Sequence, residues 1–87
     1  MWQIKFGNEA EKQMRTIDRS ASLKIQKYLK ERVALNPTSF GKALSINLKG
    51  FWRYRIGDYR VVCDLRENEL VVLVVKVGHR SKVYDGF

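Results

Sequence analysis

The chain has 87 residues, which is enough for one small domain with one modest core and excludes a second domain, so we expect a single domain over residues 1–87. Hydrophobic residues at 45% are typical of a folded globular protein, and mixed charges at 30% argue against disorder. Lys and Arg number 17 against 9 Asp and Glu, a net charge of +8, which favours a nucleic-acid surface or an acidic partner protein.

Cysteine usage and the N-terminal segment exclude further classes of protein. The one cysteine, Cys63, cannot form an internal disulfide, and the sequence has no zinc or redox motif. Residues 1–12 carry several charges and no long apolar run, so we expect neither a signal peptide nor a membrane span. We therefore expect a cytoplasmic protein without a metal or cofactor.

The N-terminal half predicts a strand followed by a helical hairpin. Residues 2–6 alternate apolar and polar side chains, as a strand with one buried face does. Asn8 is the expected N-cap of a first helix, and the pattern breaks at residues 18–20 before a second helix. The second helix is expected to end before Pro37. Its apolar stripe is Ala21, Ile25, Tyr28, Leu29 and Val33. The lysines largely outside the stripe are expected as a solvated face, with contact to ribosomal RNA as the lesser alternative: Lys24, Lys27 and Lys30.

The C-terminal half predicts a meander of strands. In residues 38–50, Leu44, Ile46 and Leu48 alternate, which leaves open a short strand or a packed connection. Strands are expected at residues 51–56 and 59–66, with turns at Gly57-Asp58 and Glu67-Asn68. The β-branched run at residues 70–77 predicts a third strand that is covered on both faces and therefore central in the sheet. Gly78 is expected to end that strand. The fold class is α+β: an N-terminal strand, a helical hairpin and an antiparallel β-meander, with both helices on one sheet face.

The stretch FWRYRIGDYRVV at residues 51–62 predicts which side chains face the core and which face a ligand. Its two-residue period puts Trp52, Tyr54 and Ile56 on the core face and Arg53 and Arg55 on the other. A two-residue turn led by glycine would pair Ile56 with Tyr59 and place Arg55 across from Arg60. Facing like charges destabilise a sheet by about 0.2–1 kcal/mol, so we expect an anionic ligand, most simply phosphate, on this face.

At this point the sequence resembles the RelE-like toxins of the RelE/ParE superfamily, the stable halves of bacterial toxin–antitoxin pairs. The resemblance lies in KALSINLKGFWRYRIGDYRVV at residues 42–62, in the apolar strand that follows, and in VGHRSKVY at residues 77–84. It implies a RelE-like fold and a ribosome-dependent endoribonuclease that cleaves mRNA in the ribosomal A site and so inhibits translation. It also implies partners: mRNA, ribosomal RNA and a cognate antitoxin that holds the toxin inactive.

The residues that the resemblance assigns to cleavage are Arg53, Arg55, Arg60, Arg80 and Tyr84. Further candidates for RNA binding are Lys49 and Lys82. Studied relatives have lysines where this chain has Arg53 and Arg55, which leaves open any role in which a basic residue loses its proton. His79 occupies a position where relatives carry His or Lys. It is a candidate for a catalytic or orienting role, although a lone histidine at a strand end is more often a structural hydrogen-bonding group.

The chemistry fits a metal-free cleavage. No cluster of Asp and Glu is visible in the sequence, so we expect the 2′-hydroxyl to attack the adjacent phosphorus and give a 2′,3′-cyclic phosphate and a 5′-hydroxyl. Arginine is protonated at neutral pH, so it serves as a bidentate clamp for phosphate rather than as a base. We expect Arg60 to be the main clamp, Arg80 to stabilise the transition state or protonate the leaving oxygen, and Tyr84 to stack on a base or orient the 2′-hydroxyl.

Two other functions remain open at this stage. One is a ParE-like toxin with the same fold, which poisons DNA gyrase through protein contacts and generally lacks the basic cleavage cluster. The other is a non-catalytic RNA-binding module, although such sheets usually expose aromatic side chains, and here Trp52 and Tyr54 are expected to point inward.

Overall fold

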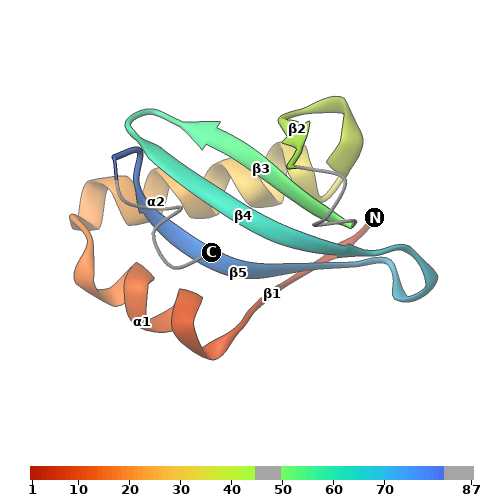
Figure 1. Ribbon diagram of the computed structural model, residues 1–87, viewed down its shortest axis with the longest axis horizontal. Helices are drawn as coiled ribbons and strands as arrows, with labels where there is room; N and C mark the ends of the chain where they lie inside the picture. The colour runs from red at the N-terminus through yellow and green to blue at the C-terminus, as the bar shows by residue number, and fades with distance from the viewer. Residues whose placement is uncertain (45–49, 82–87) are drawn as a thin grey trace.

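A mixed sheet covered by helices on one face makes up the part of the chain that the structure describes, residues 1–44 and 50–81 (Figure 1). The structure is a computed structural model. Its main elements are β1 (Gln3–Phe6), α1 (Asn8–Thr16), α2 (Arg19–Tyr28), β2 (Lys42–Ala43), β3 (Phe51–Ile56), β4 (Tyr59–Arg66) and β5 (Val71–His79). The sheet order is β1-β5-β4-β3-β2, with β1 parallel to β5 and the other neighbours antiparallel. Both helices share one core with the same sheet face, so the predicted α+β architecture is confirmed.

The boundary between β1 and α1 differs from the prediction by one residue. Asn8 is not the N-cap: Gly7 holds that position, and Asn8 is the first helical residue. The N–H of Gly7 donates to β5 at 2.9 Å, while its carbonyl accepts the N–H of Glu11 at 2.9 Å. Gly7 therefore takes part both in the pairing with β5 and in the first hydrogen bond of α1. The local sequence does not reveal the contact with β5.

The second helix carries the apolar stripe that the sequence predicts. Asp18 caps α2 by accepting a hydrogen bond from the N–H of Ala21 at 3.2 Å. After Tyr28 the chain continues as a π-helical turn, Leu29–Val33, and the helical run ends before Pro37 as predicted. The stripe residues that are fully buried are Ile25, Leu29 and Val33. They anchor the helical hairpin to the sheet.

The β3–β4 hairpin has the predicted register. Ile56 pairs with Tyr59, and Arg55 pairs with Arg60. Gly57 adopts a φ of +61° in the turn, a backbone conformation that glycine reaches without strain. Because successive side chains on a strand point to opposite faces, this register fixes which residues face the helices and which face away.

The loop before β3 contributes a short strand, which answers part of the question that the sequence left open. Lys42 on β2 pairs with Arg53 on β3. Gly41 has a φ of +67°, and a side chain there would collide with the carbonyl oxygen of Arg53, so glycine permits this close approach. The alternating positions Ile46 and Leu48 lie outside the described residues.

The apolar strand β5 lies inside the sheet, between β1 and β4, as its β-branched sequence predicts. The prediction that Gly78 ends the strand is wrong. Gly78 pairs with Arg60, and β5 continues to His79, because β4 offers hydrogen-bonding partners up to the hairpin turn.

A bulge in β5 is covered by α1. In the pairing that the structure describes, Val75 has no partner on β4. Beyond the end of β1, the side chain of Gln13 on α1 accepts the N–H of Val77 at 2.6 Å. A side chain thus satisfies a backbone donor that no neighbouring strand reaches.

The core lies between the helices and the sheet and is mostly β-branched. In the described part of the chain, every buried side-chain nitrogen and oxygen has a hydrogen-bond partner. No helix there is long and apolar enough to cross a membrane. The largest fully buried strand side chains of this core are Tyr54, Val61, Val72, Val74 and Val77. Val62 is also fully buried, but it pairs with Arg53 and lies on the opposite face of the sheet.

Candidate functional site

Alternation along β3 and β4 gathers basic side chains on the sheet face that the helices leave open. Arg53 and Arg55 share that face of β3, and Arg60 on β4 lies directly across from Arg55. Lys42 on β2 lies across from Arg53 and extends the row. Directly paired residues have Cβ atoms about 5 Å apart, so these four cations are near neighbours. We call Lys42, Arg53, Arg55 and Arg60 the basic face.

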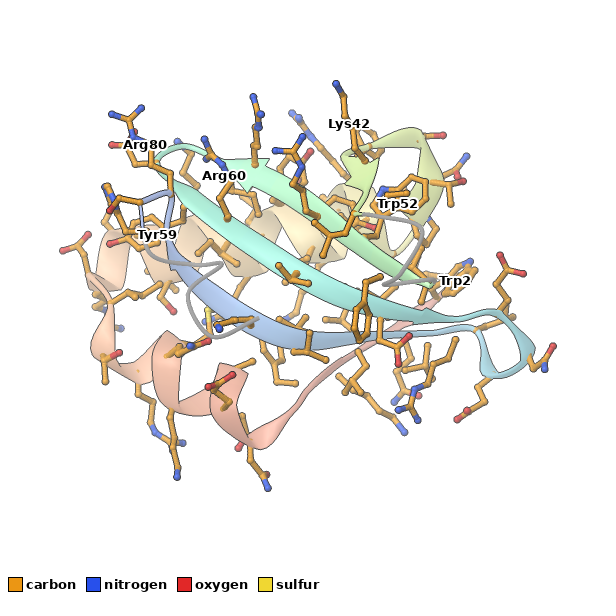
Figure 2. The ribbon with its side chains drawn as sticks, in the orientation of Figure 1. Trp2, Lys42, Trp52, Tyr59, Arg60 and Arg80 are labelled. Atoms are coloured by element: carbon orange, nitrogen blue, oxygen red, sulfur yellow. The ribbon has the colours of Figure 1, made fainter. Side chains whose placement is uncertain are left out.

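The hairpin turn between β3 and β4 positions two of the predicted arginines. Nη1 of Arg60 donates to the carbonyl oxygens of Gly57 at 3.2 Å and Tyr59 at 3.0 Å. The backbone N–H of Arg80 donates to the carbonyl of Asp58 in the same turn at 2.8 Å. Figure 2 shows the side chains of Arg60 and Arg80 at this end of the sheet. Because Arg60 uses Nη1 for the turn, its Nε and Nη2 donors can still grip a phosphate in bidentate fashion.

No ion pair among the described residues neutralises the charges of the basic face. Within residues 1–44 and 50–81, the one ion pair joins Nε of Arg66 to a carboxylate oxygen of Asp64 at 3.3 Å, at the far end of β4. Several uncompensated cations on one surface create a positive potential that attracts polyanions. The hairpin end of the basic face is therefore suited to binding phosphate.

His79 does not join the arginines. It pairs with Tyr59 across β5 and β4, and the two rings meet edge to face with centroids 5.9 Å apart. Tyr59 packs against the core, so His79 lies on the side of the sheet that carries the helices. Its Nδ1 lies 3.0 Å from Oγ of Ser81. Across from Arg60 the structure places Gly78 instead, which has no side chain to contribute.

Two aromatic residues of β3, Trp52 and Tyr54, point into the protein, as predicted. Trp52 donates from Nε1 to the carbonyl of Phe40 at 2.7 Å, and the hydroxyl of Tyr54 donates to the carbonyl of Pro37 at 2.8 Å. Desolvation by burial, with a smaller contribution from the Cys63 thiol, raises the pKa of Tyr54 far above its ordinary range. These side chains therefore stabilise the fold and take no part in base stacking or proton transfer.

Three of the predicted site residues, Lys49, Lys82 and Tyr84, lie outside the described residues. In the ranges that are described, no group of three or more His, Cys, Asp or Glu side chains is arranged to hold a metal ion. What the described part of the site offers chemically is a set of guanidinium and ammonium donors.

Helix α2 borders the basic face, which the sequence analysis did not predict. A hollow of about 370 Å³ lies between α2 and the β3–β4 turn, and Lys24 and Lys27 line it together with Arg55. A second hollow of about 220 Å³ shares Tyr28 and Arg55 with the first and continues past Arg53 and Lys42. The signal in the sequence is the helical spacing of Lys24, Lys27 and Tyr28, which reads equally well as an ordinary solvated face.

Solved structures of toxins have the same fold. The RelBE2 toxin–antitoxin complex of Mycobacterium tuberculosis matches with a TM-score of 0.84 and 20% identity, over 91% of this chain and 98% of the matched chain. A mutant of the Escherichia coli toxin RelE in the free state matches with a TM-score of 0.81 and 24% identity, over 97% and 90% of the two chains. The archaeal RelE–RelB complex of Pyrococcus horikoshii matches with a TM-score of 0.64 and 17% identity, over 94% and 98%.

The family comparison covers nearly the whole sequence. No curated protein matches the chain. The sequence model of the family described as the ParE toxin of the type II toxin–antitoxin system parDE matches residues 4–84. Since the family model covers nearly the whole sequence, the chain belongs to the ParE toxin family of type II toxin–antitoxin systems, and its fold is that of RelE toxins.

Proposed function

We propose that this toxin is an endoribonuclease that enters the ribosomal A site, cuts the mRNA there and so inhibits translation. The observation that carries the proposal is the row of cations on the basic face, which no ion pair within residues 1–44 and 50–81 neutralises. Like charges directly across a strand pair lower the stability of the sheet, so their presence calls for a compensating ligand. The phosphates of RNA are such a ligand.

The proposed reaction is a transesterification within the RNA. The 2′-oxygen forms a bond to the adjacent phosphorus and gives its proton to solvent water, while the bond from phosphorus to the 5′-oxygen breaks and that oxygen gains a proton. The products are a 2′,3′-cyclic phosphate and a 5′-hydroxyl. Negative charge builds on the phosphoryl oxygens in the transition state, and preorganised guanidinium groups stabilise it without having to reorganise.

The arginines divide the work of this mechanism between the scissile phosphate, the flanking backbone and the leaving oxygen. Arg60, held by the hairpin carbonyls through Nη1, clamps the scissile phosphate with its remaining donors. Arg53 and Arg55 bind the flanking RNA backbone. Arg80, whose backbone is tied to the same turn, stabilises the leaving oxygen or supplies its proton. Tyr84 orients the 2′-hydroxyl or stacks on a base. His79 has a structural role beside Tyr59, since it lies on the other side of the sheet.

A cognate antitoxin completes the proposed system. The M. tuberculosis and P. horikoshii structures that share this fold are complexes of a toxin with its antitoxin. A basic toxin with a net charge of +8 is matched by an antitoxin that offers acidic and apolar groups. Both proteins would act in the cytoplasm, where mRNA is translated.

The test maps mRNA 5′ ends in a translating extract. The wild type is expected to create new 5′ ends inside codons, only when ribosomes are engaged. Arg60→Ala is expected to slow cleavage by about 100- to 1,000-fold, the usual loss on removing one donor that stabilises an oxyanion. Arg66→Ala is the matched control: the same residue type, strand and face, but paired with Asp64 at the far end. It should cut like the wild type.

A specific observation favours a second candidate, poisoning of DNA gyrase. The family model that matches the sequence is that of ParE toxins, and ParE-like toxins act on gyrase. If a folded, antitoxin-free protein arrests growth without cutting mRNA and stabilises gyrase–DNA cleavage complexes in vitro, the nuclease proposal fails and this candidate replaces it. If RNA binds to the protein but no new 5′ ends form in the extract, the chain is a non-catalytic RNA-binding module.

A further inference from the structure

The two hollows beside the basic face lie next to each other and share lining residues. The larger, of about 370 Å³, lies against α2, and the smaller, of about 220 Å³, lies against β2 and β3. They meet at Tyr28 and Arg55, which line both. We call the combined surface the basic groove. Its charged lining residues are Lys24, Lys27, Glu31, Arg32, Lys42, Arg53 and Arg55.

The electrostatics of the basic groove favour a polyanion. Among the described lining residues Glu31 is the one acid, against six cations. The single ion pair within residues 1–44 and 50–81 involves none of them, since it joins Arg66 to Asp64. Lys24 and Lys27 are both exposed and three residues apart on α2, so both ammonium groups reach the same side of the helix. The groove therefore offers a series of phosphate contacts.

The centre of the groove is suited to backbone contacts rather than to reading bases. The ring of Tyr28 is already engaged: the guanidinium of Arg32 lies 5.3 Å from its centroid, and Phe40 packs against it edge to face with centroids 6.1 Å apart. Proteins that select single-stranded bases usually present aromatic faces for stacking. A groove lined by long cationic side chains, with its central aromatic ring already engaged, is suited to contacting a nucleic-acid backbone without selecting its sequence.

We propose that the basic groove binds the phosphate backbone of the single-stranded mRNA beside the cleavage point, and guides it from α2 onto the basic face. This inference rests on the proposed nuclease function, because it extends the path of the same substrate. Continuity is the main argument: Arg53 and Arg55 belong both to the groove and to the basic face, so a strand lying in one runs directly into the other. The volume of the larger hollow falls within the range of about 300–1,000 Å³ that holds a ligand of nucleotide size.

The test measures how salt affects the binding of a fluorescent single-stranded RNA whose riboses are 2′-O-methylated, so that it binds but is not cut. For single-stranded nucleic acid, each phosphate contact contributes about 0.7 to the slope of log affinity against log salt concentration. The Lys24→Ala/Lys27→Ala variant is therefore expected to lower the slope by about 1.4 and to weaken binding equally for RNAs of different sequence.

The matched control removes the same charge elsewhere. Lys12→Ala/Lys30→Ala takes away two exposed lysines of the helical hairpin that do not line the groove, and its slope should equal that of the wild type. All four lysines are exposed, so both variants should fold, which thermal unfolding checks. Equal slopes for the two variants would overturn the proposal. So would binding of a poly-glutamate peptide, but not of RNA, that depends on Lys24 and Lys27, because the groove would then be a protein interface.

Failure of the nuclease function gives a different result. The wild type could cut no RNA in a translating extract while the slope still falls for Lys24→Ala/Lys27→Ala and not for the control. In that case the groove binds RNA, and only the proposed cleavage activity is wrong. If mRNA is cut and the two variants bind alike, the cleavage stands and the groove proposal is overturned.

Discussion

On β3, neighbouring residues serve opposite sides of the sheet. Tyr54 is fully buried against the helices, and its hydroxyl donates to the carbonyl of Pro37 at 2.8 Å. Arg55, the next residue, is exposed and faces Arg60 across the strand pair. On the helix side, polar atoms are satisfied within the protein. On the open side, like charges face each other with no acid to neutralise them in the described part of the chain.

The difference separates stability from binding. Side chains on the helix side lower the free energy of the folded state through burial and satisfied hydrogen bonds. The basic face raises it slightly, because facing like charges repel each other. Proteins retain such a cost at sites where a ligand relieves the repulsion. Truncating a side chain on the helix side should therefore destabilise the protein, whereas removing an arginine from the basic face should stabilise it slightly. The following predictions test that contrast.

Tyr54→Ala should show the largest effect. Tyr54 has no exposed surface, so truncation removes a large buried ring and leaves the carbonyl of Pro37 without its partner. We expect the free energy of unfolding to fall by about 3–5 kcal/mol, as for other buried aromatic residues. Urea unfolding followed by circular dichroism measures this. Arg55→Ala on the same strand should be no less stable than the wild type, and a comparable loss for both variants would show that the two faces are not distinct.

Tyr54→Phe isolates the hydrogen bond on the helix side. The ring stays in place, but the buried carbonyl of Pro37 loses its donor. We expect a loss of about 1–3 kcal/mol, the cost of a buried acceptor left unsatisfied. The same urea unfolding experiment applies, and RNA binding should be unchanged because the hydroxyl lies on the other side of the sheet. A variant as stable as the wild type would mean that the hydroxyl contributes nothing to folding.

The free energy of unfolding should fall at alkaline pH because the thiol of Cys63 is buried in the core. Burial raises the pKa of Cys63 well above its ordinary value of 9.0, chiefly by desolvation and secondly through the nearby charge of Asp64. The unfolded state therefore releases the proton at lower pH than the folded state. Stability is fully present below pH 9.0 and should fall above it, by about 1.4 kcal/mol per pH unit for this group.

Urea unfolding at a series of pH values measures this slope, and the Cys63→Ala variant is its control. In this variant the free energy of unfolding should begin to fall only near pH 10.0, the ordinary pKa of tyrosine, because Tyr54 ionises there in the unfolded state. Identical slopes for wild type and variant between these pH values would contradict the prediction.

Arg55→Thr should have the smallest effect on stability and the opposite sign. Removing one of two facing arginines relieves the repulsion with Arg60, so the free energy of unfolding should rise by about 0.2–1 kcal/mol. Affinity for single-stranded RNA should fall in the same variant. Arg66→Thr is the control, because Arg66 is paired with Asp64 and should gain nothing. A destabilised Arg55→Thr variant would remove the argument that the basic face is maintained for a ligand.

Much of the candidate site was predictable because it depends on local period. The two-residue alternation of β3 and the glycine-led turn place Arg55 across from Arg60, and the structure confirms this register. The face occupied by His79 was not predictable. On β5, Val74 faces the core before the bulge at Val75, and Val77 and His79 face the same side after it. The bulge shifts the alternation by one residue, and nothing in the local sequence marks it.

The basic groove shows the same limit at longer range. The helical spacing of Lys24 and Lys27 puts them on one side of α2, but spacing along a helix does not say which strand lies beside it. Only packing brings them to Arg55, about 30 residues away in sequence, as the shared hollow shows. The α2 lysines were therefore interpreted from the sequence as a solvated face.

By itself the sequence determined what each residue's immediate neighbours dictate: the buried stripe of α2, the hairpin register, and the division of β3 into an apolar and a basic face. Tertiary structure decided the parallel pairing of β1 with β5, the pairing of β2 with β3, and the groove between α2 and the sheet. The physical reason is that backbone periodicity depends on a few adjacent residues, whereas strand order and grooves depend on contacts between distant segments that share no local pattern.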